Sequence, residues 1–150
     1  MPVDRSVIRV KAMLVAPSAD GTAHAVSLNP PTAENPDGYH RLIGGGVELG
    51  ETALEALRRE VHEELDATVD GPVLLTTLES IFRIDGVLGH EVFFLFTGRL
   101  DPRPAATGAT LTESDGSVVP VVWRPVDDAR EPLPLYPAAA APWVRRLTGR

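Results

Sequence analysis

The stretch from Thr52 to Leu65, TALEALRREVHEEL, constrains the fold most, because its hydrophobic period is helical over more than three turns. Its large apolar side chains recur at i, i+3, i+7 and i+11 and fall on one face: Leu54, Leu57, Val61 and Leu65. Thr52 followed three residues later by Glu55 forms a capping box, which fixes where the helix begins. The pattern predicts an amphipathic helix that starts at Thr52 and ends near Leu65.

Segments on both sides of this helix have strand character. Five of them are rich in β-branched and apolar residues: 7–16, 23–28, 73–84, 90–100 and 117–126. We expect the first two to pair as a hairpin across residues 17–22, and the third and fourth to pair around a turn at 85–89. On the first strand, Arg9 and Lys11 are expected to alternate outward. Pro120 marks the last strand as an edge strand or a bulge.

The remaining segments complete a layered domain. Residues 29–38 are rich in Pro, Asn and Gly and are predicted to form a loop, whereas residues 39–51 are a short apolar segment that runs into three glycines. Residues 137–147 are predicted to form a short terminal helix. Strands, a helix, more strands and a second helix indicate an α/β or α+β layered domain.

The length and composition are those of a globular protein. With 150 residues, of which 43% are hydrophobic, the chain can bury a core, so we expect one domain over residues 1–150. No stretch reaches the roughly 18 apolar residues of a membrane span. Residues 1–10 lack the basic start and the apolar run of a signal peptide. The absence of cysteine excludes disulfides and thiolate metal sites. We therefore expect a cytoplasmic protein that binds no membrane.

The net charge of −7 argues against nucleic-acid binding, which requires a basic surface. If the ligand of this chain is itself an anion, a cation must lie between the ligand and the acidic protein.

Three carboxylates of the predicted helix share one face, because Glu60, Glu63 and Glu64 are three and four residues apart. Like charges in this arrangement repel by roughly 0.2–0.5 kcal/mol per pair. Converging carboxylates either have raised pKa values or bind a hard cation, and Mg²⁺ is a cation that also bridges to substrate phosphates. The alternative is a solvated surface helix, on which Arg59 pairs with Glu55 and Glu63 at i,i+4.

The spacing of the glycines and charges around the helix is more specific than either feature alone. From Gly45, five residues lead to Glu51, seven more lead to Arg59, and Glu60-Val61-His62-Glu63-Glu64 follows. This pattern resembles the signature box of the Nudix hydrolases over residues 45–67, with every charged position matched. The departures are Asp66, where the family has Gly, and Ala67 at the final aliphatic position. A looser similarity, in residues 40–52 and around Trp123, extends to most of the chain.

The resemblance implies a fold and an activity. Nudix enzymes have an α/β/α sandwich around a mixed β-sheet, and we expect a single domain of this kind over residues 1–150. They hydrolyse small molecules in which a nucleoside diphosphate is linked to another moiety, and they use Mg²⁺ or Mn²⁺. The expected substrate is therefore a nucleotide-derived diphosphate, with no nucleic-acid partner; a homodimer is left open.

The resemblance also assigns site residues. By similarity, Glu60, Glu63 and Glu64 are metal ligands, the Gly45 carbonyl joins them, and one of the three glutamates takes the proton from the attacking water. Glu51 and Arg59 are expected to tie the glycine loop to the helix and to orient the ligands.

Other polar residues are weaker candidates. Family members supply an additional acidic residue from a later loop, for which Glu113 and Asp115 are the candidates, although loops are acidic for many other reasons. Glu91 points either into a cleft or toward solvent. Arg41 and Arg83 either contact phosphate or are solvated surface residues.

Three more residues have structural interpretations. His62 is expected on an exposed side of the helix, and Trp123 in the core, with a base-stacking platform as the alternative for Trp123. Asp66 is interpreted as a strained left-handed helix cap, with a role as an added metal ligand as the alternative.

The substrate is not identified by the sequence, since residues 82–85 carry neither the ADP-ribose nor the diadenosine-polyphosphate marker of the family. Two other functions fit the same fold. A catalytically silent Nudix-fold domain that binds a nucleotide and regulates a partner usually loses box glutamates, and this chain keeps them. An isomerase of isoprenoid diphosphates would need a nucleophilic cysteine, which is absent.

Overall fold

A mixed β-sheet forms the centre of the molecule and carries helices on both faces. The computed structural model describes residues 5–147, so the ends of the predicted domain, 1–4 and 148–150, lie outside the described residues. In chain order the elements are β1 (Arg9–Val15), β2 (Ala23–Asn29), β3 (Tyr39–Gly46), α1 (Ala53–Leu65), β4 (Thr68–Ile84), β5 (Val87–Asp101), β6 (Ala109–Thr112), β7 (Val118–Pro125), β8 (Leu135–Tyr136), the 3₁₀ turn η1 (Ala138–Ala140) and α2 (Ala141–Arg146).

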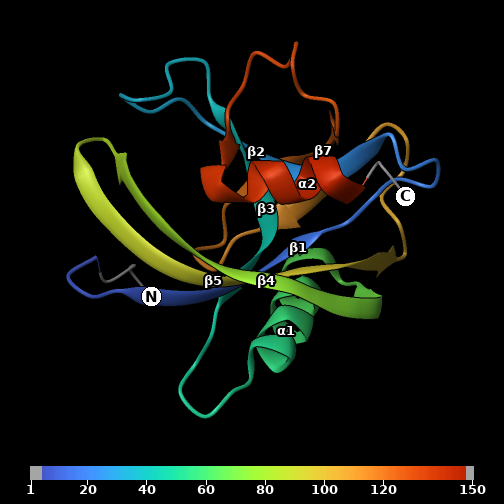
Figure 1. The fold of residues 1–150 in the computed structure, drawn as a ribbon, viewed down its shortest axis with the longest axis horizontal. Coiled ribbons are helices and arrows are strands. Elements are labelled where there is room, and N and C mark those ends of the chain that lie inside the picture. The colour runs from blue at the N-terminus through green and yellow to red at the C-terminus, as the bar shows by residue number, and fades with distance from the viewer. Residues whose placement is uncertain (1–4, 148–150) are drawn as a thin grey trace.

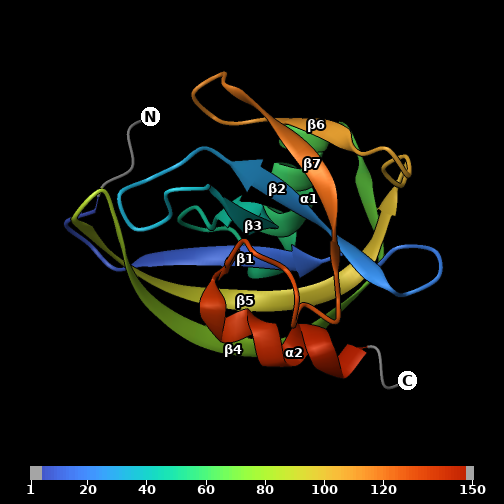
Figure 2. The same ribbon diagram turned by 90° about the horizontal axis from the view of Figure 1, so that it is seen from above.

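The strands follow the order β4-β5-β1-β3-β2-β7-β6, and β8 pairs with β3 outside this path. β1 runs parallel to β5 and β8 runs parallel to β3, whereas the other pairs are antiparallel. Figures 1 and 2 show α1 and α2 on opposite faces of this sheet. The structure therefore confirms the predicted α/β/α sandwich around a mixed β-sheet.

The sheet separates two hydrophobic cores, and β1 contributes to both. Alternate β1 residues such as Leu14 pack on the side of α1, together with Leu57 and Val61 of the helix. The residues between them, such as Met13, pack on the side of α2, together with its Val144. This two-sided burial explains why β1 reads as a nearly continuous apolar run, as central strands covered on both faces do.

Helix α1 begins and ends where the sequence predicts. The Thr52 hydroxyl accepts a hydrogen bond of 3.1 Å from the backbone N–H of Glu55, which satisfies one of the free amides of the first turn. Leu57 and Val61 are fully buried, and Leu54 and Leu65 pack partly buried against the same core. Burying side chains of this size contributes about 1.5–3 kcal/mol each, so the apolar stripe holds the helix to the sheet.

The predicted hairpin between the first two strands is wrong. β1 and β2 do not pair with each other; after the end of β1, Pro17 forms an isolated antiparallel bridge with His24 of β2. β3 lies between them instead: residues 39–42 of β3 pair with β2, and residues 43–46 pair with β1. The third apolar segment, which runs into the three glycines, therefore forms the strand that joins the two halves of the sheet.

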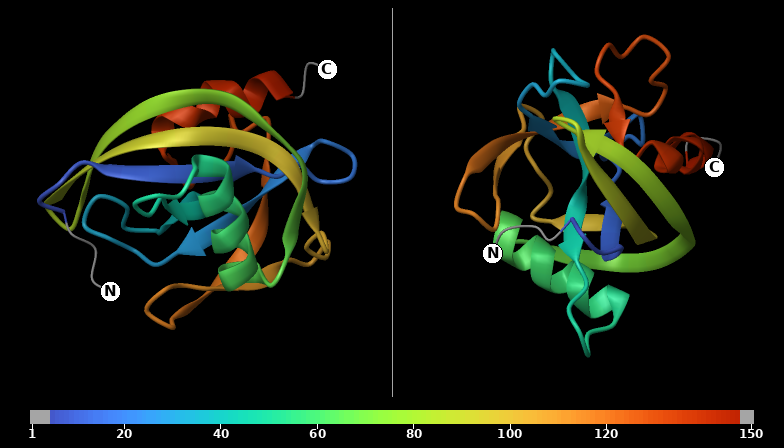
Figure 3. Two further views of the ribbon diagram at one scale, coloured as in Figure 1. Left: turned by 90° about the horizontal axis from the view of Figure 1, so that it is seen from below. Right: turned by 90° about the vertical axis from the view of Figure 1, so that its left-hand side faces the viewer.

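The second pair of strands is longer than predicted. The turn between β4 and β5 is Asp85–Gly86 alone, rather than residues 85–89, and both residues have positive φ angles, as in the type I′ turns of tight hairpins. Figure 3 shows the two strands as a long curved pair. β7 lies between β2 and β6, but its register with β2 begins at Val121, so Pro120 falls in the part paired with β6 alone. At Pro120, β7 therefore has a neighbouring strand on one side only, as suits a residue that has no backbone N–H to donate.

The loop and the terminal helix agree with their predictions. Residues 30–38 connect β2 to β3 without forming a strand or helix, and η1 with α2 covers most of residues 137–147. Trp123 is partly buried against the α1-side core and donates its indole N–H to the Ala105 carbonyl at 2.8 Å. Within residues 5–147, no helix has the length and apolar character needed to cross a membrane.

Candidate active site

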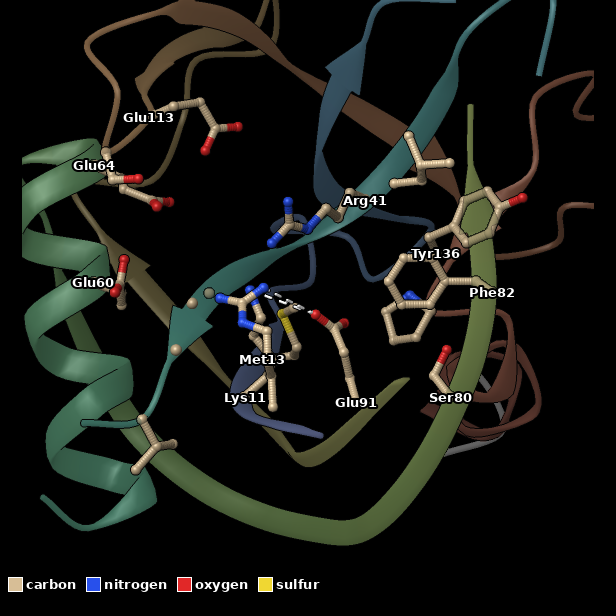
Figure 4. Close-up of a pocket in the computed structure, with 18 of the residues that line it drawn as sticks. Lys11, Met13, Arg41, Glu60, Glu64, Ser80, Phe82, Glu91, Glu113 and Tyr136 are labelled. Atoms are coloured by element: carbon tan, nitrogen blue, oxygen red, sulfur yellow. Dashed lines mark ion pairs between the residues drawn. The ribbon is translucent and has the colours of Figure 1, made fainter. Parts of the chain in front are cut away.

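A cavity of about 520 Å³ lies between α1 and the β4–β5 pair (Figure 4). Its acidic wall consists of three carboxylates of α1 and one from the loop after β6: Glu60, Glu63, Glu64 and Glu113. Aromatic side chains line the opposite end: Tyr39, Phe82 and Tyr136. Charged side chains of β1, β3 and β5 lie between the two: Arg9, Lys11, Arg41 and Glu91. The cavity thus joins residues from most of the chain.

Arg59 ties the loop after β3 to α1. Its Nε and Nη2 atoms donate to the two carboxylate oxygens of Glu51 at 2.8 and 2.9 Å, and Nη2 also donates to the Gly46 carbonyl at 2.9 Å. Its Nη1 atom donates to Glu60 at 2.9 Å and to Glu63 at 3.3 Å. The expected contact between Glu51 and Arg59 is therefore present, and the i,i+4 pair expected with Glu63 is present as well.

This bidentate contact keeps both partners charged. The hydrogen bonds from the Arg59 guanidinium, with a further one from the backbone N–H of Glu48, lower the pKa of Glu51 to about 2. The same carboxylate raises the pKa of Arg59 above its usual range. Charged bidentate pairs fix geometry as well as energy, so the loop 47–50 has a defined position against the helix.

Glu60 is crowded between Gly45 and the neighbouring carboxyl of Glu64. A Cβ atom at position 45 would collide with the carboxylate group of Glu60, so only glycine leaves room for that side chain. Burial, together with the neighbouring charges of Glu60 and then Glu113, raises the pKa of Glu64 to about 8. Carboxylates that are desolvated and repel one another in this way are stabilised by a cation.

The centre of the cavity is a buried ionic cluster. Lys11 and Arg9 approach the same Glu91 oxygen at 3.6 and 3.5 Å, and the Lys11 side chain is only 6% exposed. The prediction that Lys11 points outward is therefore wrong, because both faces of β1 are covered and its face opens on the cavity. Burial, and then the positive charge of Arg41, lowers the pKa of Lys11 to about 7. Glu91, for which two orientations were considered, lies in the cavity.

Comparison with known proteins agrees with this geometry. The model of the NUDIX domain family matches residues 22–147, which is most of the chain. The chain belongs to the Nudix family. Among functionally curated proteins, none matches the sequence significantly.

Solved structures of other Nudix proteins share the fold. A MutT Nudix hydrolase from Burkholderia pseudomallei has a TM-score of 0.64 and 21% identity, over 90% of this chain and 95% of the other. A putative Nudix hydrolase from Chromobacterium violaceum has a TM-score of 0.62 and 18% identity, over 97% and 81%. An ADP compounds hydrolase has a TM-score of 0.62 and 18% identity, over 95% and 75%. With every charged position of the signature box present, the chain is a Nudix-type pyrophosphohydrolase.

The acidic wall fits a divalent cation, which Nudix enzymes generally use. As placed, no three His, Asp or Glu side chains of residues 5–147 gather closely enough to hold a metal, since Glu60 and Glu63 both contact Arg59. The donors are nonetheless those a hard cation prefers, because carboxylate oxygens crowd beside a glycine and the pKa of Glu64 is raised. A bound cation would be held by Glu60, Glu63 and Glu64, with the Gly45 carbonyl.

The two later-loop candidates are placed differently. Glu113 lines the cavity, whereas Asp115 does not. One Asp115 carboxylate oxygen instead accepts hydrogen bonds from the backbone N–H and the hydroxyl of Ser117, at 2.9 and 2.6 Å. Arg83 also lies outside the cavity, where it donates to the Gly86 carbonyl at 3.0 Å.

Asp66, the clear departure from the signature box, caps the helix. It adopts the left-handed conformation, with φ 50° and ψ 46°, and its backbone N–H donates to the His62 carbonyl at 3.0 Å. Its side chain is exposed and does not line the cavity, and His62 is exposed as predicted. The geometry is that of the cap interpretation rather than of an added metal ligand.

The aromatic end of the cavity contains the residues that the sequence did not reveal. Phe82, Ser80 and Tyr136 come from strands with no motif around them. One indirect signal exists: Gly89 pairs with Phe82 in the register, and a Cβ there would collide with the Phe82 ring. A glycine inside a strand often marks such a close approach.

Proposed function

We propose that this Nudix enzyme hydrolyses a phosphoanhydride bond in a nucleoside diphosphate linked to another moiety, with Mg²⁺ or Mn²⁺ as cofactor. The observation that carries this proposal is the crowding of Glu60 between Gly45 and Glu64, in a cavity large enough for a nucleotide. When bound, the metal would screen the charge of the diphosphate and activate a water. One structural neighbour, an ADP compounds hydrolase, acts on molecules of this class, which supports a nucleotide-derived substrate.

The protein residues have separate tasks in this proposal. Glu60, Glu63 and Glu64 would hold the metal, and the first two would exchange hydrogen bonds with Arg59 for the cation. Glu51 holds Arg59 in turn, so it acts on the site by position rather than by contact with the substrate. Glu113 reaches the same cavity from another loop, which makes it a candidate for accepting the proton of the attacking water.

The test is a colorimetric phosphate assay, coupled to a phosphatase, over a panel of nucleoside diphosphate derivatives with Mg²⁺. Glu64→Gln is expected to remove most of the activity while leaving the thermal melt in EDTA nearly unchanged, because burial raises the pKa of the Glu64 carboxyl to about 8, so that at pH 7 it is mostly neutral, as the amide is. The matched control is Glu55→Gln, which changes an exposed glutamate of the same helix outside the cavity. Full activity in Glu64→Gln would contradict the assignment of Glu64.

Metal binding has a readout without turnover. A ligand that binds only the folded state raises the melting temperature by mass action. Mg²⁺ at millimolar concentration is expected to raise the melting temperature of the wild type and of Glu55→Gln, but not that of Glu64→Gln. An unchanged wild-type melting temperature would count against the metal site.

A further inference from the structure

The last strand at one side of the sheet, β4, has two halves of different character. Its first half contains Pro72, which has no N–H to donate, and both irregularities in its register with β5 fall before Thr76. From Thr76 to Ile84 the register is regular, and this segment contains no Gly, Pro or Lys. Figure 3 shows β4 on the outer side of its curved pair with β5. Natural edge strands avoid pairing with other chains by means of bulges, prolines and lysines, so the second half of β4 lacks the usual protection.

Alternate residues of this second half direct their main-chain groups away from β5. Ile84 and Val87 pair on either side of the two-residue turn, and in such hairpins the flanking pair exchanges both of its hydrogen bonds. The N–H and C=O groups of Glu79, Ile81 and Arg83 therefore point to the outer side of β4. Among residues 5–147, no strand pairs with that side.

The side chains of the same three residues share one face of the sheet and are exposed. Glu79, Ile81 and Arg83 alternate with Ser80 and Phe82, which line the cavity on the other face. Ile81 is 63% exposed, although it is a large apolar side chain. The exposed row thus has an apolar centre, with an acid two residues before it and a base two residues after it.

This row is complementary to itself. If two β4 strands pair antiparallel about a twofold axis at Ile81, the two Ile81 side chains meet, and each Glu79 lies directly opposite Arg83 of the partner subunit. An axis at Glu79 or at Arg83 would instead set identical charges against each other. Glu79 uses one carboxylate oxygen for His90, at 2.9 Å, and Arg83 uses one guanidinium nitrogen for the Gly86 carbonyl, at 3.0 Å. Each side chain therefore has further polar atoms for a contact across the axis.

We propose that the second half of β4 is a dimer interface, at which a second copy of this chain pairs antiparallel and continues the sheet across a twofold axis at Ile81. Specific interfaces of standard size bury about 1,200–2,000 Å², and one short strand pairing lies at the low end of this range, so the dimer should form reversibly with concentration. The proposal concerns the edge of the sheet and does not depend on the proposed activity.

The first test is sedimentation equilibrium of the full chain from micromolar to hundreds of micromolar concentrations. The wild type should pass from the monomer mass to the dimer mass as its concentration rises. Ile81→Lys sets two like charges against each other at the axis and should remain a monomer. Val118→Lys is the matched control, because Val118 is 61% exposed and lies on β7, away from this edge, and it should dimerise like the wild type.

The second test is a reversal of the charges on either side of the axis. Glu79→Arg and Arg83→Glu each set like charges against each other in both cross-strand pairs, so each should weaken the dimer by about tenfold or more. Mixed in equal amounts, the two variants should recover at least the wild-type affinity, because a mixed dimer again has opposite charges in both pairs. Arg103→Glu makes the same change of charge at an exposed residue outside the interface and should have no effect. Thermal melts at low concentration check that every variant is folded.

Three results would overturn the inference. One is a wild type that stays monomeric over the whole range, which would leave this edge to a different partner. Another is a pair of charge-reversed variants that each dimerise as tightly as the wild type, since the dimer would then use another surface. The third is a mixture of the two folded variants that dimerises no better than either alone, because the antiparallel register about Ile81 requires recovery.

Discussion

Three neighbouring glycines at the end of β3 face three different surroundings, so alanine at each position should have a different effect. Gly44 has φ +146°, and a Cβ there would overlap the backbone carbonyl oxygen of Ala12. At Gly45 the Cβ would meet the Glu60 side chain, which can move. At Gly46 the nearest atom within 4 Å would be Nη2 of Arg9, at 3.8 Å.

The expected loss of stability depends on which atoms must move to make room for the new Cβ. Gly44→Ala combines a disfavoured φ, which costs about 1–3 kcal/mol, with overpacking against main chain, which costs about 1–3 kcal/mol, so the fold should lose about 2–6 kcal/mol. Gly46→Ala meets no obstacle and keeps its carbonyl for Arg59. Gly45→Ala should change folding little, but it displaces Glu60 from its place beside Arg59, and a disturbed ligand shell typically costs about 10- to 100-fold in metal affinity.

Two measurements separate these effects. Urea unfolding in EDTA gives the stability of each variant, and a Mg²⁺ titration followed by the melting temperature gives its metal affinity. We expect Gly44→Ala to be the least stable, and Gly45→Ala alone to combine near wild-type stability with a weakened metal response. A Gly45→Ala titration that overlays that of Gly46→Ala would refute the placement of Glu60 in the metal site.

Two further predictions concern polar contacts. Glu51→Gln and Arg59→Met should each lower both stability and turnover, and the double variant should cost less than the sum; strictly additive losses would show that the pair is not coupled. His24 is fully buried with both ring nitrogens unpartnered, and burial, then the charges of Arg124 and His40, lowers its pKa from 6.5 to about 4. A lowered pKa means that the unfolded chain takes the proton first. The free energy of unfolding should therefore fall as the pH drops from 6.5 toward 4, by about 3 kcal/mol in total. Urea unfolding at pH 7 and pH 4.5 should show a smaller fall in His24→Leu than in the wild type. An equal fall in both proteins would contradict the assignment of this pH dependence to His24.

Local features were predictable because their causes are local. The cap at Thr52, the apolar stripe of α1 and the left-handed Asp66 all depend on residues within a few positions of one another. The contact between Glu51 and Arg59 was predictable for a related reason, since the spacing of the signature box fixes a short loop and two helical turns between them.

Long-range features were not predictable from the sequence. The hairpin prediction for β1 and β2 assumed that adjacent strands pair, whereas β3, from farther along the chain, pairs with both. The alternating pattern of its strand predicts that Lys11 faces solvent. Its burial is compensated by an ion pair with Glu91 of β5, which is distant in the sequence. Phe82 and Tyr136 are 54 residues apart and share a cavity wall without any periodic signal.

Helix α1 belongs both to the hydrophobic core and to the candidate site, and contacts on two of its faces hold its carboxylates in place. One face is fixed by apolar burial through Leu57 and Val61. The other is fixed by Arg59, which reaches across to the Gly46 carbonyl and to Glu51. A helix held on both sides cannot rotate about its axis without losing one set of contacts. The backbone positions of the metal-site glutamates are therefore set by folding itself, and a cation would require only that the side chains of Glu60 and Glu63 turn from Arg59 toward Glu64.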